Sequence, residues 1–252
     1  MKTLEKLYTI IDLLEEIGEL RLHEIADSLR LNKSTVYRFL SSLLEHGYLK
    51  KDEETSRYSL GLRFINLAES IADRLDLRTI VHPHLVDLEK VAGETIHLTV
   101  FDGKTVVYID KVERNKPVVM YSKIGNIAPI YCTAAGKAVL AYQSDEQIAE
   151  LLEGTELKQY TENTITNKDL LLEELERIRK DGFAVDNEEY ERNICCIASP
   201  IWHHNGKVNA AISISAVRSR KDLESLLQYR YYIKEKSEVI SKELGYKGTG
   251  RR

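Results

Sequence analysis

The sequence lacks a long apolar run. No stretch approaches the ~18 consecutive apolar residues that a membrane-spanning helix needs, and charges interrupt every apolar run within the first twenty residues, MKTLEKLYTIIDLLEEIGEL. These absences argue against a transmembrane span and a signal peptide. With 252 residues, 43% hydrophobic and 30% charged, the chain is expected to be globular, with one or two domains, a cytoplasmic location and no membrane partner.

Cysteine is scarce. Cys132, Cys195 and Cys196 form an odd number without zinc-ribbon spacing, and a chain of this length does not need disulfides. We expect three reduced thiols, no metal and no cofactor. A metal- or redox-responsive site built from Cys132, Cys196 and a histidine such as His97 stays open as an alternative, although no pair of them has ligand spacing.

Helical and strand patterns divide the first 60 residues. Apolar positions recur at three and four residues over 3–17, then over 22–29 and 33–46, which predicts three amphipathic helices. Gly18 and Gly47 end the first and third, and Asn32 is placed to cap the third. Short strands at 48–51 and 57–60, joined by a polar turn, predict a β-wing. The sequence therefore predicts a winged helix-turn-helix domain over residues 1–60.

The third helix has no carboxylate on its outward face. Between Arg30 and Leu44 there are three basic residues and no acidic one, although the chain has a net charge of -4. A recognition helix presents such a face to the DNA major groove, while the wing contacts phosphates. The predicted DNA-binding residues are Lys33, Ser34, Thr35, Tyr37, Arg38 and Ser41 on the helix and Lys50, Lys51 and Arg57 on the wing.

The charge of the whole N-terminal region opposes this interpretation in part. Residues 1–60 contain nine Lys and Arg against eleven Asp and Glu, whereas a DNA-binding domain is usually basic. Attraction to DNA must then come from the local distribution of charge. The alternative is a solvated helix face in a small interaction domain.

The remainder of the chain mixes helices and strands. Helices are predicted over 61–74 and 76–91, hairpins around Asp102-Gly103 and Asn205-Gly206, helices near 134–142, 145–153 and 167–181, and a long helix over 219–244. This pattern is typical of an α+β domain. We expect a linker helix over residues 61–76, a sheet domain over 77–246 and a disordered tail over 247–252.

Four segments together resemble the IclR family of bacterial transcriptional regulators. They are the winged helix running through YSLGLRF, then YCTAAGKAVLA, then GFAVDNEEYERNICCIASPI, and the closing AAISISA. The resemblance covers essentially the whole chain. It implies a DNA-binding winged helix, a linker helix and a GAF-like effector-binding domain, in a homodimer or homotetramer that binds double-stranded DNA at a pseudo-palindromic operator.

The segment around Thr133 permits two physical interpretations. Thr133 can cap a helix whose small residues leave free amides open to a ligand carboxylate, or the small residues simply allow close packing on the sheet. Asp186 is expected to follow a short strand, GFAV, where it could accept ligand hydroxyl groups. The resemblance favours a ligand pocket, and it implies the effector-binding residues Met120, Thr133, Ala134, Ala135, Gly136, Asp186, Cys196, Ser213 and Ser215. Adjacent strand residues face opposite ways, so Cys195 and Cys196 cannot both line it.

The expected function is that of a repressor that responds to a small organic or sugar acid. Sugar-acid catabolites such as 2-keto-3-deoxygluconate are common effectors in the family that the sequence resembles. No histidine shows a family signature for a base that would activate a thiol, so no catalytic residue and no enzymatic activity are expected. An enzyme fused to an interaction module remains the less favoured alternative.

Overall fold

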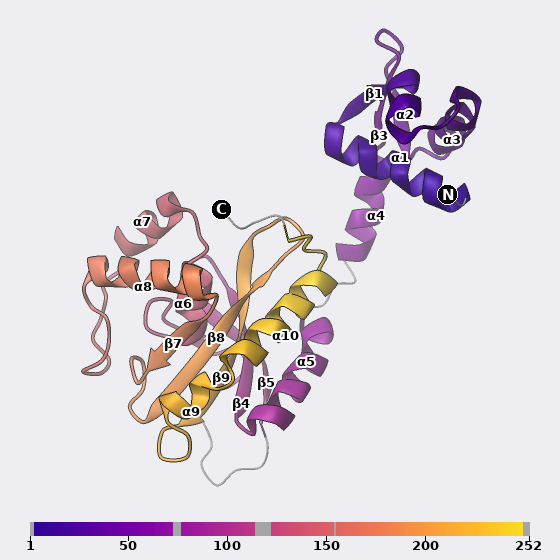
Figure 1. Cartoon of the computed structure of the whole chain (residues 1–252). Coiled ribbons are helices and arrows are strands. Elements are labelled where there is room, and N and C mark those ends of the chain that lie inside the picture. Colours follow the sequence, from indigo (N-terminus) through magenta and orange to yellow (C-terminus); the bar gives the residue numbers. More distant parts are fainter. Residues whose placement is uncertain (1–2, 73–76, 114–121, 154, 249–252) are drawn as a thin grey trace. The chain divides into compact units, whose positions relative to one another are not determined.

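The chain forms two compact units, Met1–Leu75 and Asp76–Arg252, each with its own hydrophobic core (Figure 1). The computed structural model describes residues 3–72, 77–113, 122–153 and 155–248. No helix in these ranges is long and apolar enough to cross a membrane.

The first unit is a winged helix-turn-helix, as predicted. Its helices are α1 (Thr3–Ile17), α2 (Leu22–Leu29) and α3 (Lys33–Glu45), and its sheet has the order β1-β3-β2, formed by β1 (Glu19–Arg21), β2 (Leu49–Lys51) and β3 (Arg57–Leu60). The strand β1 was not predicted. It is only three residues long and pairs with β3, a tertiary contact that leaves no periodic signal in so short a segment.

Local chemistry fixes the turn before α3. The Asn32 side chain accepts a hydrogen bond from the Thr35 amide at 2.8 Å and caps the helix, as expected. Arg30 ends α2 in the left-handed conformation with φ +52°. The left-handed conformation usually costs a non-glycine residue about 1–2 kcal/mol of conformational energy. The turn therefore keeps the helix-turn-helix geometry at a local cost in stability.

The two helices predicted after the wing are present. They are α4 (Arg63–Ala72) and α5 (Leu77–Ala92). Apolar side chains around the start of α4 are largely exposed, with Leu62 at 76% and Ile65 at 54%. The second helix instead packs against the sheet of the second unit through Val81, Leu85 and Leu88.

An antiparallel six-stranded sheet forms the centre of the second unit. Its order is β6-β5-β4-β9-β8-β7. The strands are β4 (Thr95–Phe101), β5 (Val106–Val112), β6 (Ile127–Ala128), β7 (Ala184–Asn187), β8 (Ile194–Trp202) and β9 (Val208–Val217).

Helices cover both faces of this sheet (Figure 1). One face packs against α5, α9 (Leu223–Leu227) and α10 (Arg230–Glu243), and the other against α6 (Ala134–Leu140), α7 (Asp145–Glu153) and α8 (Lys168–Asp181). Successive strand residues therefore enter different cores. Cys195 packs with the α5 and α10 side, whereas Cys196 contacts the α6 side, which confirms that the two thiols face opposite ways.

The hairpins predicted around Asp102-Gly103 and Asn205-Gly206 are present, with loops over 102–105 and 203–207. In these loops the Asp102 and Asn205 side chains accept hydrogen bonds from backbone amides. Two details of the predicted second unit are wrong. Asp186 lies within β7 rather than after a strand. The long C-terminal helix is two helices, separated at Gln228 and Tyr229, with Asp222 capping the first.

Gly136 has a packing role. A Cβ added there would lie 2.5 Å from the Ile130 carbonyl oxygen and 2.7 Å from the Ile130 Cα. Both atoms belong to backbone, so the turn before α6 would have to move. Close packing, one of the two interpretations of the small residues in this segment, therefore applies to Gly136.

We predict that Gly136→Ala lowers the free energy of unfolding by ~1–3 kcal/mol, the usual range for overpacking a core. Chemical denaturation of the full chain measures it. An unchanged free energy of unfolding in Gly136→Ala would contradict the packing argument.

Candidate functional site

The outward face of α3 presents the predicted DNA-binding side chains together. Lys33, Ser34, Tyr37 and Arg38 are exposed, Tyr37 at 59%. Val36, Phe39, Leu40 and Leu43 fill the core on the opposite side of the same helix. Thr35 and Ser41 are half-buried at the edge of the exposed face.

The three basic residues predicted on the wing differ in their surroundings. Lys50 is exposed. Lys51 pairs with Glu53 at 3.2 Å, and Arg57 donates to the Glu19 carbonyl oxygen at 3.2 Å while pairing with the Glu19 carboxylate at 3.7 Å. Lys50 is therefore the wing residue that can reach a phosphate without first leaving another partner seen in the described part of the chain.

A second group of predicted residues meets on the sheet of the other unit. Asp186 on β7 lies opposite Cys196 on β8, which lies opposite Ser215 on β9. Ser213, two residues along β9 on the same face, lies opposite His97 on β4. The register of four strands thus brings one row of polar side chains to the face that α6 covers.

These side chains line a cavity of about 40 Å³ between the sheet and the start of α6. It is large enough for a few water molecules, at ~10–15 Å³ each by the same measure. Gly136, predicted as part of the pocket, lies outside the cavity lining, and Met120 lies outside the described residues. The lining consists of His97, Tyr108, Ser122, Thr133, Ala134, Ala135, Asp186, Tyr190, Glu191, Ile194, Cys196, Ser213 and Ser215.

The cap of α6 has the predicted geometry. The Thr133 hydroxyl accepts the Gly136 amide at 3.1 Å and donates to the Pro129 carbonyl at 2.8 Å. An α-helix gives its first amides no intrahelical acceptor. The amides of Ala134 and Ala135 lie at the start of the helix, in the cavity wall. A ligand oxygen in the cavity could accept hydrogen bonds from them.

His97 is a neutral polar group in the cavity wall. Burial, with a smaller effect of the Lys111 ammonium, lowers the pKa of His97 to about 3. Its Nε2 lies 2.8 Å from the Ser122 hydroxyl, and its ring packs on Tyr108 with centroids 4.9 Å apart. The sequence had suggested His97 only as a metal ligand, and the alternation in ETIHLTV could have placed it on the same face as the pocket.

Asp186 is buried at the cavity wall with 3% of its surface exposed. Its Oδ1 accepts the Glu189 amide at 2.7 Å. Burial and the nearby Glu189 carboxylate raise the pKa of Asp186 to about 7, against the opposing effects of the backbone hydrogen bond and Lys137. Near neutral pH this carboxyl group is therefore present in both its protonated and its ionised form.

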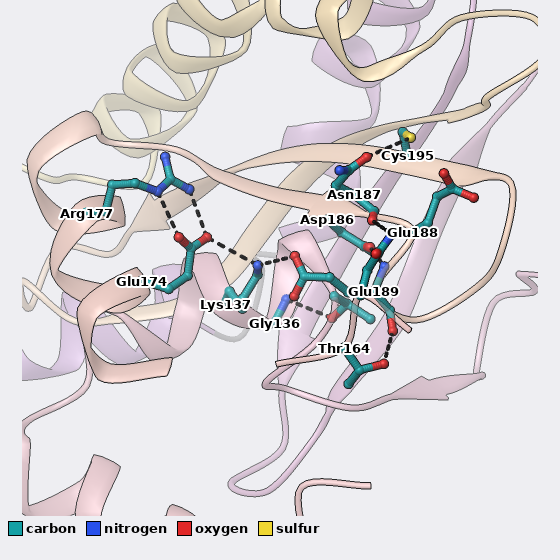
Figure 2. A network of polar contacts seen from close by, with 12 residues as sticks. Gly136, Lys137, Thr164, Glu174, Arg177, Asp186, Asn187, Glu188, Glu189 and Cys195 are labelled. Atoms are coloured by element: carbon teal, nitrogen blue, oxygen red, sulfur yellow. Dashed lines mark hydrogen bonds and ion pairs between the residues drawn. The ribbon is translucent and has the colours of Figure 1, made fainter. Parts of the chain in front are cut away.

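A buried lysine that sequence analysis missed lies between Glu189 and Glu174 (Figure 2). Lys137, on α6, is 1% exposed, and its Nζ lies 2.5 Å from Glu189 and 3.2 Å from Glu174. Glu174 also receives two hydrogen bonds from Arg177, each of 2.8 Å. Two carboxylates thus neutralise the lysine charge, and the network joins α6, α8 and the turn after β7.

The thiols have the environment of structural cysteines. Burial raises the pKa of Cys132 and of Cys196 well above the ordinary value, so both are protonated at neutral pH, and a protonated thiol is a poor metal ligand and a slow nucleophile. Within the described residues, no three His, Cys, Asp or Glu side chains are grouped as metal ligands. These surroundings offer no support for a metal- or redox-responsive site.

The chain belongs to the IclR family of transcriptional regulators. The family model of the IclR helix-turn-helix domain matches residues 3–53, and that of the bacterial transcriptional regulator IclR C-terminal region matches residues 69–242. Members of this family are DNA-binding transcriptional regulators and not enzymes. The predicted family and fold class are confirmed.

Individual relatives match along nearly the whole chain. The HTH-type transcriptional regulator KdgR of Escherichia coli is 36% identical over 241 residues, 96% of this chain and 92% of the relative, and XynR of the same organism is 32% identical over 98% of both chains. The crystal structure of Thermotoga maritima IclR is 41% identical, with a TM-score of 0.66, and the match covers 97% of this chain and 99% of the other.

We predict that Arg38→Ala weakens binding to a specific operator by ~1–3 kcal/mol, because we expect this exposed side chain of α3 to contact a base edge or a phosphate. Lys50→Ala should instead lower affinity on all sequences and reduce the salt-dependence slope by about one. Fluorescence anisotropy across a salt series separates the two effects. Lys104→Ala, which removes an exposed charge from the other unit, is the matched control. Operator affinity unchanged in Arg38→Ala at fixed salt would contradict this placement.

We predict that Asp186→Asn becomes more stable relative to the wild type as the pH rises from about 4 to about 7. The folded-state pKa of Asp186, about 7, lies above the ordinary value of 3.8. In that window the folded wild type binds more protons than the unfolded chain, so it loses up to about 1.4 kcal/mol of stability per pH unit, whereas asparagine does not titrate. Urea denaturation at several pH values measures the difference, and a difference independent of pH would contradict the shift.

Proposed function

We propose that the protein is a repressor whose affinity for DNA changes when a small hydroxy or keto acid binds in the cavity under α6. The observation that carries this proposal is the convergence of Thr133, Ala134, Ala135, Asp186, Cys196, Ser213 and Ser215 on one cavity. One segment at the start of α6 and three strands that are distant from it in the sequence supply these residues, and close packing of α6 does not require so many polar groups in the wall.

The wall offers a different kind of partner to each end of such a ligand. The amides of Ala134 and Ala135 can donate to a carboxylate, and the partial positive charge of the helix N-terminus favours an anion there. Asp186, Ser213 and Ser215 can accept or donate hydrogen bonds to hydroxyl or keto oxygens. A polyhydroxy acid such as 2-keto-3-deoxygluconate suits this arrangement, and Met120 is proposed to add an apolar contact.

Binding requires the wall to adjust. A cavity of about 40 Å³ holds a few waters, and a sugar acid occupies much more space than that. The ligand must displace the water and move lining residues outward. An effector changes DNA affinity only through its different affinities for two conformations, typically by ~1–3 kcal/mol, and this required adjustment gives the two conformations a physical basis.

The DNA partner is proposed to be a pseudo-palindromic operator, bound by a homodimer or homotetramer in the cytoplasm. A single winged helix buries only ~600–1,000 Å² on DNA, so such modules commonly gain affinity by dimerising. The exposed Leu62 and Ile65 beside the linker helix are suited to contact a second subunit. The α3 residues and Lys50 are proposed to contact this operator, with Lys51 and Arg57 exchanging their internal partners for phosphates.

We predict that Ala135→Leu abolishes binding of the acid, because three additional carbon atoms enter the cavity at the amides that hold the carboxylate. Titration calorimetry with 2-keto-3-deoxygluconate, gluconate, lactate and pyruvate tests the wild type and the variant. Operator affinity of the variant without acid serves as the control for folding and should equal that of the wild type. Acid binding by Ala135→Leu as tight as by the wild type, or wild-type operator affinity that ignores the bound acid, would refute the proposal.

A further inference from the structure

The cavity proposed to take an acid contains carboxylates but no charged cation among its described lining residues. Asp186 and Glu191 are its ionisable acidic groups, and His97 is neutral because of its burial. A ligand carboxylate that enters this space meets negative charge. The amides at the start of α6 provide only partial positive charge, so a full compensating charge must come from elsewhere.

Among the described residues, the two cations that act on the cavity wall already have partners. The Lys137 ammonium is held by Glu189 and Glu174 at 2.5 and 3.2 Å. The Lys111 ammonium pairs with Glu113 at 2.9 Å and donates to the Ser122 carbonyl at 3.0 Å. Releasing Lys137 toward the cavity would leave the buried Glu189 carboxylate without its cation, which is strongly unfavourable. Releasing Lys111 would break its ion pair with the partly exposed Glu113 and its hydrogen bond to Ser122.

Asp186 is the group that can remove the conflict. On its own sheet it faces the Cys196 thiol and, across the cavity, His97 and Tyr108. From α6 and the preceding turn it faces Lys137 and Cys132, and from the turn after β7 it faces Glu189, Tyr190 and Glu191. The groups whose charge acts on Asp186 are thus mainly acidic or neutral.

We infer that the acid effector binds together with a proton, which is taken from solvent onto Asp186. This inference rests on the proposed function and deepens it. The balanced step is ionised Asp186, one proton and one ligand carboxylate giving a neutral Asp186 acid beside the bound anion. The proton lies on Oδ2, because Oδ1 accepts the Glu189 amide. The protonated group then donates a hydrogen bond to the ligand instead of repelling it.

The pH dependence follows with a defined sign. With a pKa of about 7 for free Asp186, the wild type should take up about 0.9 proton per ligand at pH 8 and about 0.1 at pH 6. Affinity should fall about five-fold from pH 7 to pH 8 and approach a ten-fold fall per unit above that. The carboxyl groups of 2-keto-3-deoxygluconate, gluconate, lactate and pyruvate stay ionised from pH 6 to pH 8. The change in affinity with pH is therefore due to a group of the protein.

Titration calorimetry of the full chain in buffers with different heats of protonation measures the uptake, with phosphate and Tris at pH 8 and cacodylate and MES at pH 6. The probes are 2-keto-3-deoxygluconate, gluconate, lactate and pyruvate. Asp186→Asn should bind without proton uptake and with affinity independent of pH. Glu189→Gln should move the affinity midpoint to lower pH, because it removes the negative charge beside Asp186 and leaves Lys137 with one carboxylate fewer.

The outcomes separate this inference from the function on which it rests. No heat with any of the four acids at pH 6 would overturn both. Binding by the wild type without proton uptake at pH 8 would overturn the inference alone and leave an acid-responsive regulator. Uptake that persists in Asp186→Asn would also overturn it, since another group would then hold the proton. If Asp186→Asn fails to fold, the proton uptake of the wild type at pH 8 against that at pH 6 decides the question.

Discussion

The ion pair between buried Lys137 and Glu189 is the constraint on which the effector unit depends. A lysine that is 1% exposed would destabilise the fold if it were unpaired, because a buried charge without compensation costs several kcal/mol. Glu189 and Glu174 provide that compensation from two different segments (Figure 2). Glu189 therefore holds α6 against the turn after β7, and Glu174 holds it against α8. The start of α6 and the turn after β7 both contribute to the cavity wall.

The same pair sets the charge of the cavity. Because Glu189 and Glu174 pair with Lys137, the lysine lowers the pKa of Asp186 by less than burial and the Glu189 carboxylate raise it. Glu189 meanwhile uses its backbone amide to hold Asp186 Oδ1 at 2.7 Å. One residue thus orients the Asp186 carboxyl group through its amide and disfavours its ionisation through its side chain. The position of Glu189 beside Lys137 and Asp186 therefore affects both the anchoring of α6 and the protonation of Asp186.

Sequence reasoning succeeded where local chemistry decides the structure. The caps at Asn32 and Thr133 and the helical period of α3 depend on a few neighbouring residues. It failed where a distant contact decides, since β1 exists because β3 pairs with it. For Gly136 it left close packing and ligand binding both open, and the Ile130 backbone requires close packing there. Lys137 was missed because a lysine inside a run of small residues gives no sign of its partners, Glu174 and Glu189, which are 37 and 52 residues away.

The position of the pocket residues depended on register, which short motifs do not specify. Asp186, Cys196 and Ser215 form one row only because β7, β8 and β9 pair with a particular alignment. A shift by one residue would turn all three toward the opposite core. Resemblance to a family could supply these residues as a set, since the alignment is a property of the fold. The place of His97 in the cavity wall, in contrast, could be assigned only once the pairing of β4 with β9 was known.

The acidic character of the chain limits how DNA binding can be achieved. Nine basic and eleven acidic residues in the first 60 leave no general attraction to a polyanion, and the contacts proposed here involve only a few side chains on α3 and on the wing. A small number of phosphate contacts gives a shallow salt dependence and a modest total affinity per subunit. Under those conditions a coupling free energy of ~1–3 kcal/mol is a large fraction of what a subunit contributes. A weak DNA-binding unit is therefore well matched to control by a small effector pocket.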